Sequence, residues 1–325
     1  MNNQYAPIII PTLNRYEHLK RCVESLAKNT DADKTELVIG LDYPPAEKYM
    51  DGYNKIKAYL PTITGFAKVT ILDTQKNLGA YKNVVRLQDY VREQGYDAFI
   101  CTEDDNEFSP CFLSYCNWAL DYFKEDNGIF YICGYNLIDT PELKNNIYKY
   151  NHGFCAWGCA TWMDRLQRER GVYDFDYMKR FVDSYPASII FNKKKVLLAA
   201  SLLWMLKKKY ILGDTAIQAI PDEEKWCVFP KISMVRNWGH DGSGLHGGTQ
   251  ESYETLIKQP IDESFVFEPY IEGDLFTPDI AQKYKAKYGR NSFVSKVRAI
   301  GRFLIFKTTG RIVVLERPNW LKRRR

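Results

Sequence analysis

Short apolar runs alternate with amphipathic helix patterns through the first 136 residues of this 325-residue chain, and this alternation limits the possible folds more than any other feature. The apolar runs, which we expect to form strands, are residues 6–10, 36–42, 68–73, 97–105 and 128–136. Four helical patterns lie between the apolar runs. The first has Leu19, Cys22, Val23 and Leu26 on one face, and the others span residues 46–60, 80–94 and 109–126. Continuous apolar runs are typical of parallel strands that are buried on both faces. We therefore expect an α/β fold with a mostly parallel sheet and helices on both of its faces.

Polar residues follow these strands, and the carboxyl ends of a parallel sheet should bring them to one crevice. They are Asn14 and Arg15, Asp42, Asn77 to Gly79, and Glu103 to Asp105. Asn14 and Glu17 form a capping-box pair, which is expected to start the first helix. The chain has neither a GxGxxG motif after the first strand nor a GxxxxGK[ST] motif, which argues against a dinucleotide-binding Rossmann enzyme and a P-loop NTPase.

The segment "ICTEDDNEFSP" (100–110) gathers Glu103, Asp104 and Asp105 at one strand end, where adjacent carboxylates repel one another. A divalent cation would neutralise such a cluster, and carboxylate oxygens suit Mg²⁺ or Mn²⁺. These ions bind one or two carboxylates together with substrate phosphates, so the cluster implies a phosphate-bearing substrate. The alternative is a solvated acidic turn before the helix that starts at Ser109, where acidic residues are mildly favourable.

The alternation ends after residue 150. The chain becomes aromatic there, with Trp157 and Trp162, and then helical over about 176–209. A short β pair is expected within 225–235, before the glycine-rich loop 239–248. No run approaches the ~18 uninterrupted apolar residues of a membrane-spanning helix, and we expect no signal peptide. The eight cysteines form no CxxC pair, so we expect reduced core thiols in a cytoplasmic protein.

Charge is distributed unevenly along the chain. Residues 281–325 carry 14 Lys and Arg against one acid, Glu316, whereas the other 280 residues carry 31 basic and 39 acidic side chains. A nucleic-acid-binding domain has its basic face on the fold itself, so this distribution predicts no nucleic-acid partner.

The basic C-terminal segment also has an amphipathic pattern. Phe293, Val297, Ile300 and Leu304 are expected on one helical stripe, flanked by Lys296, Arg298 and Arg302. This combination favours an interfacial helix on an anionic membrane surface. A disordered basic tail and a helix that docks on the acidic face of a protein partner are the alternatives.

The ordered set of polar segments resembles the GT-A glycosyltransferases, and among them N-acetylglucosaminyltransferase I and the bacterial sugar transferases related to it. The segments are "PTLNR" (11–15), Asp42, "NLGAYKN" (77–83), "EDD" (103–105), "AWGCATW" (156–162), "GDTAIQA" (213–219) and "SMVRNWGHDGSGLHGG" (233–248). The resemblance implies the GT-A, or nucleotide-diphospho-sugar transferase, fold. Residues 1–136 would form its nucleotide-sugar-binding half, 137–280 its acceptor-side half, and 281–325 a basic amphipathic helical tail.

By the same resemblance, Asp105 would coordinate Mn²⁺ or Mg²⁺ at the diphosphate of a UDP-sugar, and His246 would be a second contact to the metal or diphosphate. Glu103 and Asp104 would bind the ribose and nearby donor groups. Arg15 would contact the diphosphate. A solvent-exposed arginine on the first helical turn is the alternative for Arg15.

The remaining donor contacts implied by the resemblance are Asp42 at the uracil edge, with Thr12, Asn14, Asn77, Gly79 and Lys82. Asp42 could instead begin the turn at "DYPP". Eukaryotic relatives carry a histidine before the helix at 80–94, and this chain does not. Lys82 would replace it as a phosphate partner, or would face solvent.

An inverting transferase needs one general base for the acceptor hydroxyl. The resemblance points to Asp214, for which helix capping is the alternative role, and Asp222 or Glu223 would be next in line. Trp157 and Gly158 would form the wall of the sugar pocket, or Trp157 would belong to the core.

The sequence therefore predicts a metal-dependent inverting glycosyltransferase, cytoplasmic and peripheral on the inner face of a bacterial cell membrane. It would move a sugar from a UDP donor to a hydroxyl of a surface glycan, either a polysaccharide or a lipid-linked oligosaccharide. Two alternatives are a nucleotidyl or other nucleotide-sugar enzyme on a similar sheet, and a non-catalytic glycan-binding protein that retains the fold.

Overall fold

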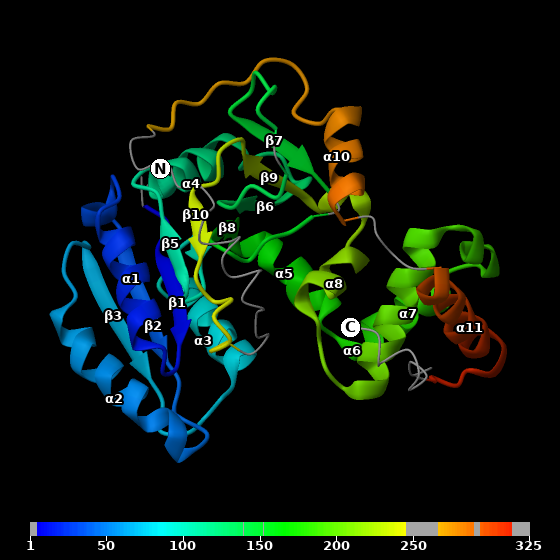
Figure 1. Ribbon diagram of the computed structural model, residues 1–325, viewed down its shortest axis with the longest axis horizontal. Coiled ribbons are helices and arrows are strands. Elements are labelled where there is room, and N and C mark those ends of the chain that lie inside the picture. Colours follow the sequence, from blue (N-terminus) through cyan, green and yellow to red (C-terminus); the bar gives the residue numbers. More distant parts are fainter. Residues whose placement is uncertain (1–4, 139, 152, 245–265, 289–292, 314–325) are drawn as a thin grey trace. The chain divides into compact units, whose positions relative to one another are not determined.

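The computed structural model describes residues 5–138, 140–151, 153–244, 266–288 and 293–313 (Figure 1). The chain forms two compact units, one of Met1–Arg165 with Trp226–Lys283 and one of Leu166–Lys225 with Tyr284–Arg325. In the second unit, two helices that are distant in the sequence pack together.

The first unit contains a mixed eight-stranded sheet with the order β3-β2-β1-β4-β8-β6-β9-β7. Its strands are β1 (Ile8–Thr12), β2 (Glu36–Leu41), β3 (Lys68–Asp73), β4 (Ala98–Cys101), β6 (Ile129–Cys133), β7 (Ile147–Tyr150), β8 (Cys159–Trp162) and β9 (Trp226–Pro230). Strands β3, β2, β1 and β4 pair in parallel, as the apolar runs predict. Strand β8 lies antiparallel between β4 and β6, β9 is parallel to β6, and β7 is antiparallel to β9.

Helices cover both faces of the sheet in the first unit. They are α1 (Tyr16–Ala27), α2 (Met50–Tyr59), α3 (Ala80–Glu93) and α4 (Phe112–Tyr122). Alternate residues of a strand face opposite sides, and Ile8, Ile10 and Ile39 share one core cluster with apolar residues of α1, α2 and α4. On the opposite face α3 approaches so closely that a Cβ on Gly40 would lie 2.7 Å from Asn83 Oδ1. The predicted α/β fold with helices on both faces is confirmed.

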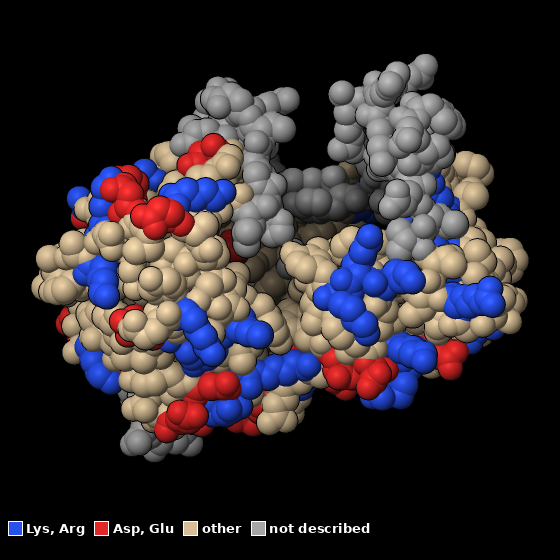
Figure 2. Space-filling model, turned by 90° about the horizontal axis from the view of Figure 1, so that it is seen from below, with Lys and Arg blue, Asp and Glu red and all other residues tan. Residues whose placement is uncertain are grey.

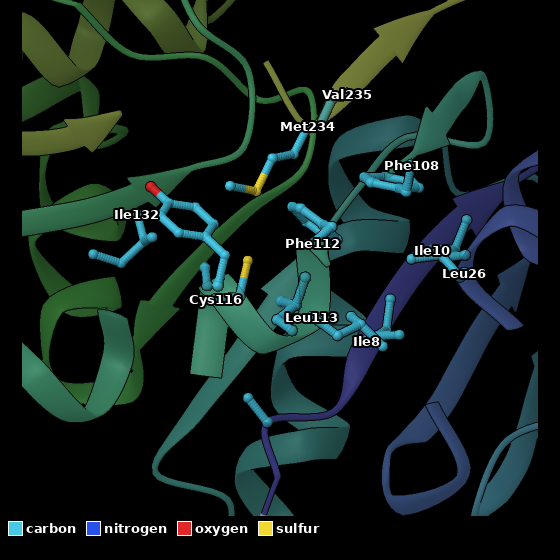
Figure 3. Packing of buried hydrophobic residues seen from close by; sticks show 14 of the residues in the cluster. Ile8, Ile10, Leu26, Phe108, Phe112, Leu113, Cys116, Ile132, Met234 and Val235 are labelled. Atoms are coloured by element: carbon cyan, nitrogen blue, oxygen red, sulfur yellow. The ribbon is translucent and has the colours of Figure 1, made fainter. Parts of the chain in front are cut away.

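Figure 3 shows side chains of this core from close by. Phe108 and Phe112 lie with their ring centroids 4.4 Å apart, and a Cβ on Gly158 would lie within 3.1 Å of both rings and of Val235. Burial of such side chains contributes roughly 1.5–3 kcal/mol each. The segment that follows the acidic residues is therefore anchored in the core through Phe108.

Two short strands form a separate antiparallel ladder, β5 (Asn106–Phe108) with β10 (Val235–Asn237). The sequence predicted one strand over 97–105 and a local β pair within 225–235. The structure instead ends β4 at Cys101, and it pairs β9 with the main sheet and β10 with β5. These pairings join segments that are distant in sequence, so local apolar patterns could not reveal them.

The second unit is helical. Its elements are α6 (Phe175–Ser184), the 3-10 turn η4 (Ala187–Phe191), α7 (Lys193–Lys208), α8 (Gly213–Ala216) and α11 (Phe293–Thr309). Helices α5 (Met163–Val172) and α10 (Pro278–Tyr288) each begin in the first unit and end in the second. Helix α11 packs on α7 and buries Ala299, Phe303 and Phe306. Phe293 and Val297 of the predicted stripe are exposed, whereas Ile300 and Leu304 are half-buried. The stripe is therefore not the face that packs on the protein.

Acidic and basic side chains lie beside one another along the lower part of the face shown in Figure 2.

All eight cysteines lie within the described ranges, and none of them forms a disulfide. Over the described residues, no helix combines the length and the apolar character that a membrane crossing requires.

A buried carboxylate, Glu36, ties the start of β2 to its neighbours. It is 6% exposed and accepts hydrogen bonds from Thr70 Oγ1 at 2.7 Å and from the Tyr96 hydroxyl at 2.8 Å, and it pairs with Lys68 at 2.9 Å. Burial by itself raises the pKa of Glu36, but the hydrogen bonds from Thr70, Lys68 and Tyr96 outweigh burial and lower that pKa below its ordinary value. The ionised form is therefore favoured in the folded protein.

We predict that Glu36→Gln lowers the free energy of unfolding by roughly 1–2 kcal/mol at pH 7, because charge-assisted hydrogen bonds are lost. A lowered folded-state pKa contributes stability above the unfolded pKa of about 4.3, and this contribution is lost as the pH falls through the folded value. The difference in the free energy of unfolding between wild type and Glu36→Gln should thus be constant near neutral pH and become smaller below about pH 4.3. Denaturant unfolding from pH 7 to pH 3.5 measures it.

Glu24→Gln serves as the control, because Glu24 is 55% exposed and should contribute little at any pH. If the difference in the free energy of unfolding between wild type and Glu36→Gln grew as the pH fell, the lowered pKa of Glu36 would be contradicted.

Candidate active site

Two adjacent carboxylates, Asp104 and Asp105, lie buried in the turn between β4 and β5, where they are 4% and 7% exposed. We call them the carboxylate pair. Parallel pairing of β1 with β4 brings the residues after β1 to the same edge of the sheet. Thr12 Oγ1 donates a hydrogen bond to Asp104 Oδ2 at 2.7 Å. Arg15 Nη1 lies 2.8 Å from Asp105 Oδ2, and Arg15 Nη2 pairs with Asp104 Oδ1.

Arg15 occupies the N-cap position of α1 without making a side-chain cap. The predicted capping box of Asn14 and Glu17 is therefore wrong, since the helix begins at Tyr16. A cation beside the positive end of a helix is unfavourable unless an anion lies close to it. Here the anion is the carboxylate pair, which holds the guanidinium from both sides.

Burial and the ion pairs act together on these groups. Burial alone would lower the pKa of Arg15, but Asp104 and Asp105 outweigh it and raise that pKa, so the guanidinium stays charged. Burial has the largest effect on Asp104 and raises its pKa. Arg15 opposes this effect and Asp105 adds to it, which leaves the pKa of Asp104 above its ordinary value. The ionised pair therefore depends on a nearby positive charge.

The β5–β10 ladder places a third polar residue on the carboxylate pair. In its register Asn237 lies opposite Asn106, one position after Asp105. Asn237 is 3% exposed, and its Nδ2 donates to Asp105 Oδ1 at 3.0 Å and to Asn106 Oδ1 at 2.9 Å. The backbone then approaches so closely that a Cβ on Gly239 would lie 2.0 Å from Asp105 Oδ2.

The loop that follows β10 is fixed to the elements around it. Trp238 Nε1 donates to Glu107 Oε2 at 2.8 Å, and the guanidinium of Arg21 lies 4.0 Å from the centre of the Trp238 ring. Two residues after Gly239, the carboxylate of Asp241 lies 3.2 Å from His18 Nε2. Helix α1 and strand β5 thus hold this loop beside the carboxylate pair.

A second cluster forms around Asp42 at the end of β2, next to the first. The Asp42 N–H donates to the Thr12 carbonyl at 2.9 Å. Its buried carboxylate accepts from the N–H groups of Leu78 and Gly79 at 2.8 and 2.9 Å, and from Asn77 Nδ2 at 3.1 Å. Asp42 therefore holds the loop that leads into α3, and a contact to the uracil edge stays a prediction.

Aromatic side chains line the other flank of the loop after β10. Trp157 is half-buried, and its ring meets Tyr135 edge-on at 4.7 Å and His240 edge-on at 5.7 Å between centroids. Gly158 has a φ of +65°, and a Cβ there would lie 2.6 Å from Phe108. Trp157 thus packs against the core cluster and lies beside His240, and its role as the wall of a sugar pocket stays a prediction. Gly158 packs against the core.

The remaining predicted site residues are less closely grouped. Glu103 and Lys82 are exposed, and the Asn14 carbonyl lies against α2, where a Cβ on Gly52 would come within 1.9 Å of it. Asp214 belongs to α8 in the second unit, and its side chain lies outside what the structure describes. His246 likewise lies outside the described residues.

The carboxylate pair is chemically suited to Mn²⁺ or Mg²⁺ bound by one or two carboxylates and substrate phosphates. Where residues are described, no group of three or more His, Cys, Asp and Glu could form a metal cage by itself. Asp105 would be the main ligand, with Asp104 beside it. Both already neutralise Arg15, so a bound cation would compete with that side chain.

Sequence reasoning missed Asn237, Gly239, His240 and the His18–Asp241 pair as parts of this site. Asn237 and Asp105 are separated by 132 positions in the chain. The only signal was the polar and glycine-rich composition of "SMVRNWGHDGSGLHGG", which does not indicate which residue meets which.

Comparison with known proteins agrees with this geometry. Residues 8–165 match the model of glycosyl transferase family 2, and they span β1 to the first residues of α5, including the carboxylate pair. Residues 8–165 therefore form a glycosyltransferase-like domain, and its α/β sheet with helices on both faces matches the GT-A fold. The narrower likeness to N-acetylglucosaminyltransferase I stays a prediction. No curated protein sequence matches the chain.

Two solved structures show distant likeness. One is a mannosyltransferase from Pyrobaculum calidifontis in complex with GDP-Man and Mn²⁺, with a TM-score of 0.36, 13% identity, and coverage of 50% of this chain and 46% of that one. The other is TarS from S. aureus, with a TM-score of 0.33, 13% identity, and coverage of 51% and 29%. The aligned part spans less than half of either neighbour.

We predict that Gly239→Ala disturbs the site more than the fold. The added methyl group would have to displace Asp105 or the loop, and a displacement of about 1 Å at a reacting centre can cost up to about 10²-fold in rate. Overpacking of this kind lowers the free energy of unfolding by roughly 1–3 kcal/mol. Sugar-nucleotide turnover and thermal unfolding measure the two effects. Gly171→Ala is the control, since a Cβ there meets nothing within 4 Å. Unchanged turnover in Gly239→Ala would contradict this placement of Asp105.

Proposed function

We propose that this chain is a metal-dependent, inverting glycosyltransferase that moves a sugar from a UDP-sugar to a hydroxyl of a surface glycan, either a polysaccharide or a lipid-linked oligosaccharide. The observation that carries the proposal is the buried carboxylate pair at the carboxyl end of β4, within the matched glycosyl transferase domain. Ligands of open α/β sheets bind at this edge.

In this proposal, each polar cluster holds one end of the donor. The carboxylate pair lies at the diphosphate, where Thr12 orients Asp104 and Asn237 orients Asp105. Asp42 acts at the nucleoside end by holding the 77–79 loop in place. A bound Mn²⁺ or Mg²⁺ would supply positive charge to the departing nucleotide diphosphate.

The acceptor side rests on the aromatic wall and on the predicted base. The Trp157 ring offers an apolar face for sugar C–H groups, next to His240. Asp214 would take the proton of the acceptor hydroxyl as its oxygen attacks the anomeric carbon and the bond to the nucleotide diphosphate breaks. With one base and one displacement, the configuration at that carbon inverts.

Release of UDP from a panel of UDP-sugars with Mn²⁺, with GDP-mannose as a contrasting donor, tests the proposal. Asp105→Ala should abolish turnover and Mn²⁺-dependent UDP binding in calorimetry, because it removes a direct ligand. Asp214→Asn should keep donor binding and lose roughly 10²-fold or more in transfer, because the amide cannot accept the proton.

Asp121→Ala is the matched control for Asp105, since the Asp121 side chain is 82% exposed on α4. A folded Asp105→Ala protein with unchanged Mn²⁺-dependent UDP affinity would refute the metal assignment. Release of pyrophosphate from UTP and a sugar 1-phosphate, without release of UDP from any UDP-sugar, would favour a nucleotidyl enzyme. Donor binding without turnover would favour a glycan-binding protein.

We further propose that the second unit binds an anionic membrane surface. Phe191 of η4 is 84% exposed, and η4 contacts α11, where Phe293 and Val297 are 80% and 50% exposed. Basic residues accompany these apolar side chains, at 193–195 directly after Phe191 and at 296 and 298 on α11. Apolar and basic side chains together suit an anionic lipid interface.

The double substitution Phe293→Asp and Val297→Asp should abolish binding to anionic vesicles at low salt, since it leaves the α7-facing side of α11 unchanged. High salt should weaken wild-type binding, because the Debye length shrinks to about 3 Å at 1 M. Vesicle flotation measures both effects. Val266→Asp is the control, as Val266 is 73% exposed in the other unit. Wild-type protein that ignores anionic vesicles at low salt would rule out the membrane surface and favour a protein partner.

A further inference from the structure

We propose that Arg15 changes partners when the donor binds. It is the counter-charge of the carboxylate pair in the empty site, and it moves to the diphosphate when a divalent cation takes its place on Asp105. This inference rests on the proposed function, because it concerns the same donor site.

All four carboxylate oxygens of the pair accept from protein groups in this structure. Thr12 and Asn237 each hold one outer oxygen with a neutral donor. Arg15 holds one oxygen of Asp104 and one of Asp105, and it is the charged donor among the three. A carboxylate oxygen has two lone pairs, so the neutral donors can remain when a cation binds. Arg15 cannot remain in place without setting two positive groups side by side.

The surroundings of Arg15 allow it to move. Its side chain is 20% exposed, and a glycine of the loop after β10 lies next to it, since a Cβ on Gly244 would lie 3.3 Å from Arg15 Nη1. The residue also occupies the N-cap position of α1, a helix of 12 residues, without capping it through its side chain. That end favours anions, so a diphosphate there would meet both the helix end and the guanidinium.

A partner change of this kind couples the two ligands. Without nucleotide, a divalent cation must displace Arg15 from both carboxylates before the diphosphate that would receive it has bound. With nucleotide present, the diphosphate receives Arg15, and each ligand therefore favours binding of the other. Linkage makes this coupling reciprocal, and couplings of this kind are typically about 5- to 150-fold.

The test is calorimetric titration of wild type and Arg15→Gln with Mn²⁺ alone, and with UDP in the presence of Mn²⁺. We expect Arg15→Gln to bind Mn²⁺ alone about ten-fold more tightly than wild type, and UDP with Mn²⁺ about ten-fold more weakly. A purely structural arginine would give a variant that is weaker in both titrations. The melting temperature of Arg15→Gln should be lower than that of wild type without Mn²⁺ and should rise more on its addition.

Arg15→Lys keeps the positive charge but cannot bridge two carboxylates as the guanidinium does. Its affinities for Mn²⁺ and for UDP with Mn²⁺ should therefore lie between those of wild type and Arg15→Gln. This variant provides the test if Arg15→Gln does not fold. Lys20→Gln removes an exposed charge from the same helix and should change neither titration. Mn²⁺ affinity in Arg15→Gln equal to or weaker than in wild type would overturn the partner change alone. Absence of Mn²⁺-dependent UDP binding in every protein, wild type included, would instead overturn the metal-dependent function.

Discussion

The ion pair between Arg15 and the carboxylate pair determines how the candidate site is built. Two adjacent carboxylates that are 4% and 7% exposed would not stay ionised without a nearby positive charge. Arg15 supplies this charge from the start of α1, and the β1–β4 pairing brings it within reach of Asp105 at 2.8 Å. Arg15 offsets only part of the effect of burial, so the pKa of Asp104 stays above its ordinary value. A divalent cation would add the positive charge that the carboxylate pair still lacks.

Other parts of the site can be understood as supports for this arrangement. Asn237 fixes one oxygen of Asp105 through the β5–β10 ladder, and Gly239 lets the backbone pass close to the other. Phe108, at the end of the strand that follows the turn, packs against Phe112 in the core (Figure 3). A rigid turn lowers the cost of ordering the carboxylates when a donor binds.

Much of the sheet could be predicted from the sequence, because strands buried on both faces need continuous apolar runs. Strands β1, β2, β3, β4 and β6 all lie at or beside the predicted runs, and the polar residues after β1 and β4 do converge. The insertion of β8 and the β5–β10 ladder could not be predicted, because they depend on pairing between distant segments. The direct ion pairs of Arg15 with Asp104 and Asp105, 89 and 90 positions away, were not predicted, because convergence of the strand ends does not indicate which side chains meet. The capping box failed because Arg15, held by that distant pair, occupies the N-cap position instead.

The partner change of Arg15 can be tested in a crystal grown with UDP and Mn²⁺ and measured at a wavelength where manganese scatters anomalously. We expect an anomalous peak at the carboxylate of Asp105, with the Arg15 guanidinium turned from the carboxylate pair to the phosphates of UDP. UDP bound elsewhere, or bound with Arg15 still bridging Asp104 and Asp105 and no manganese beside them, would contradict it.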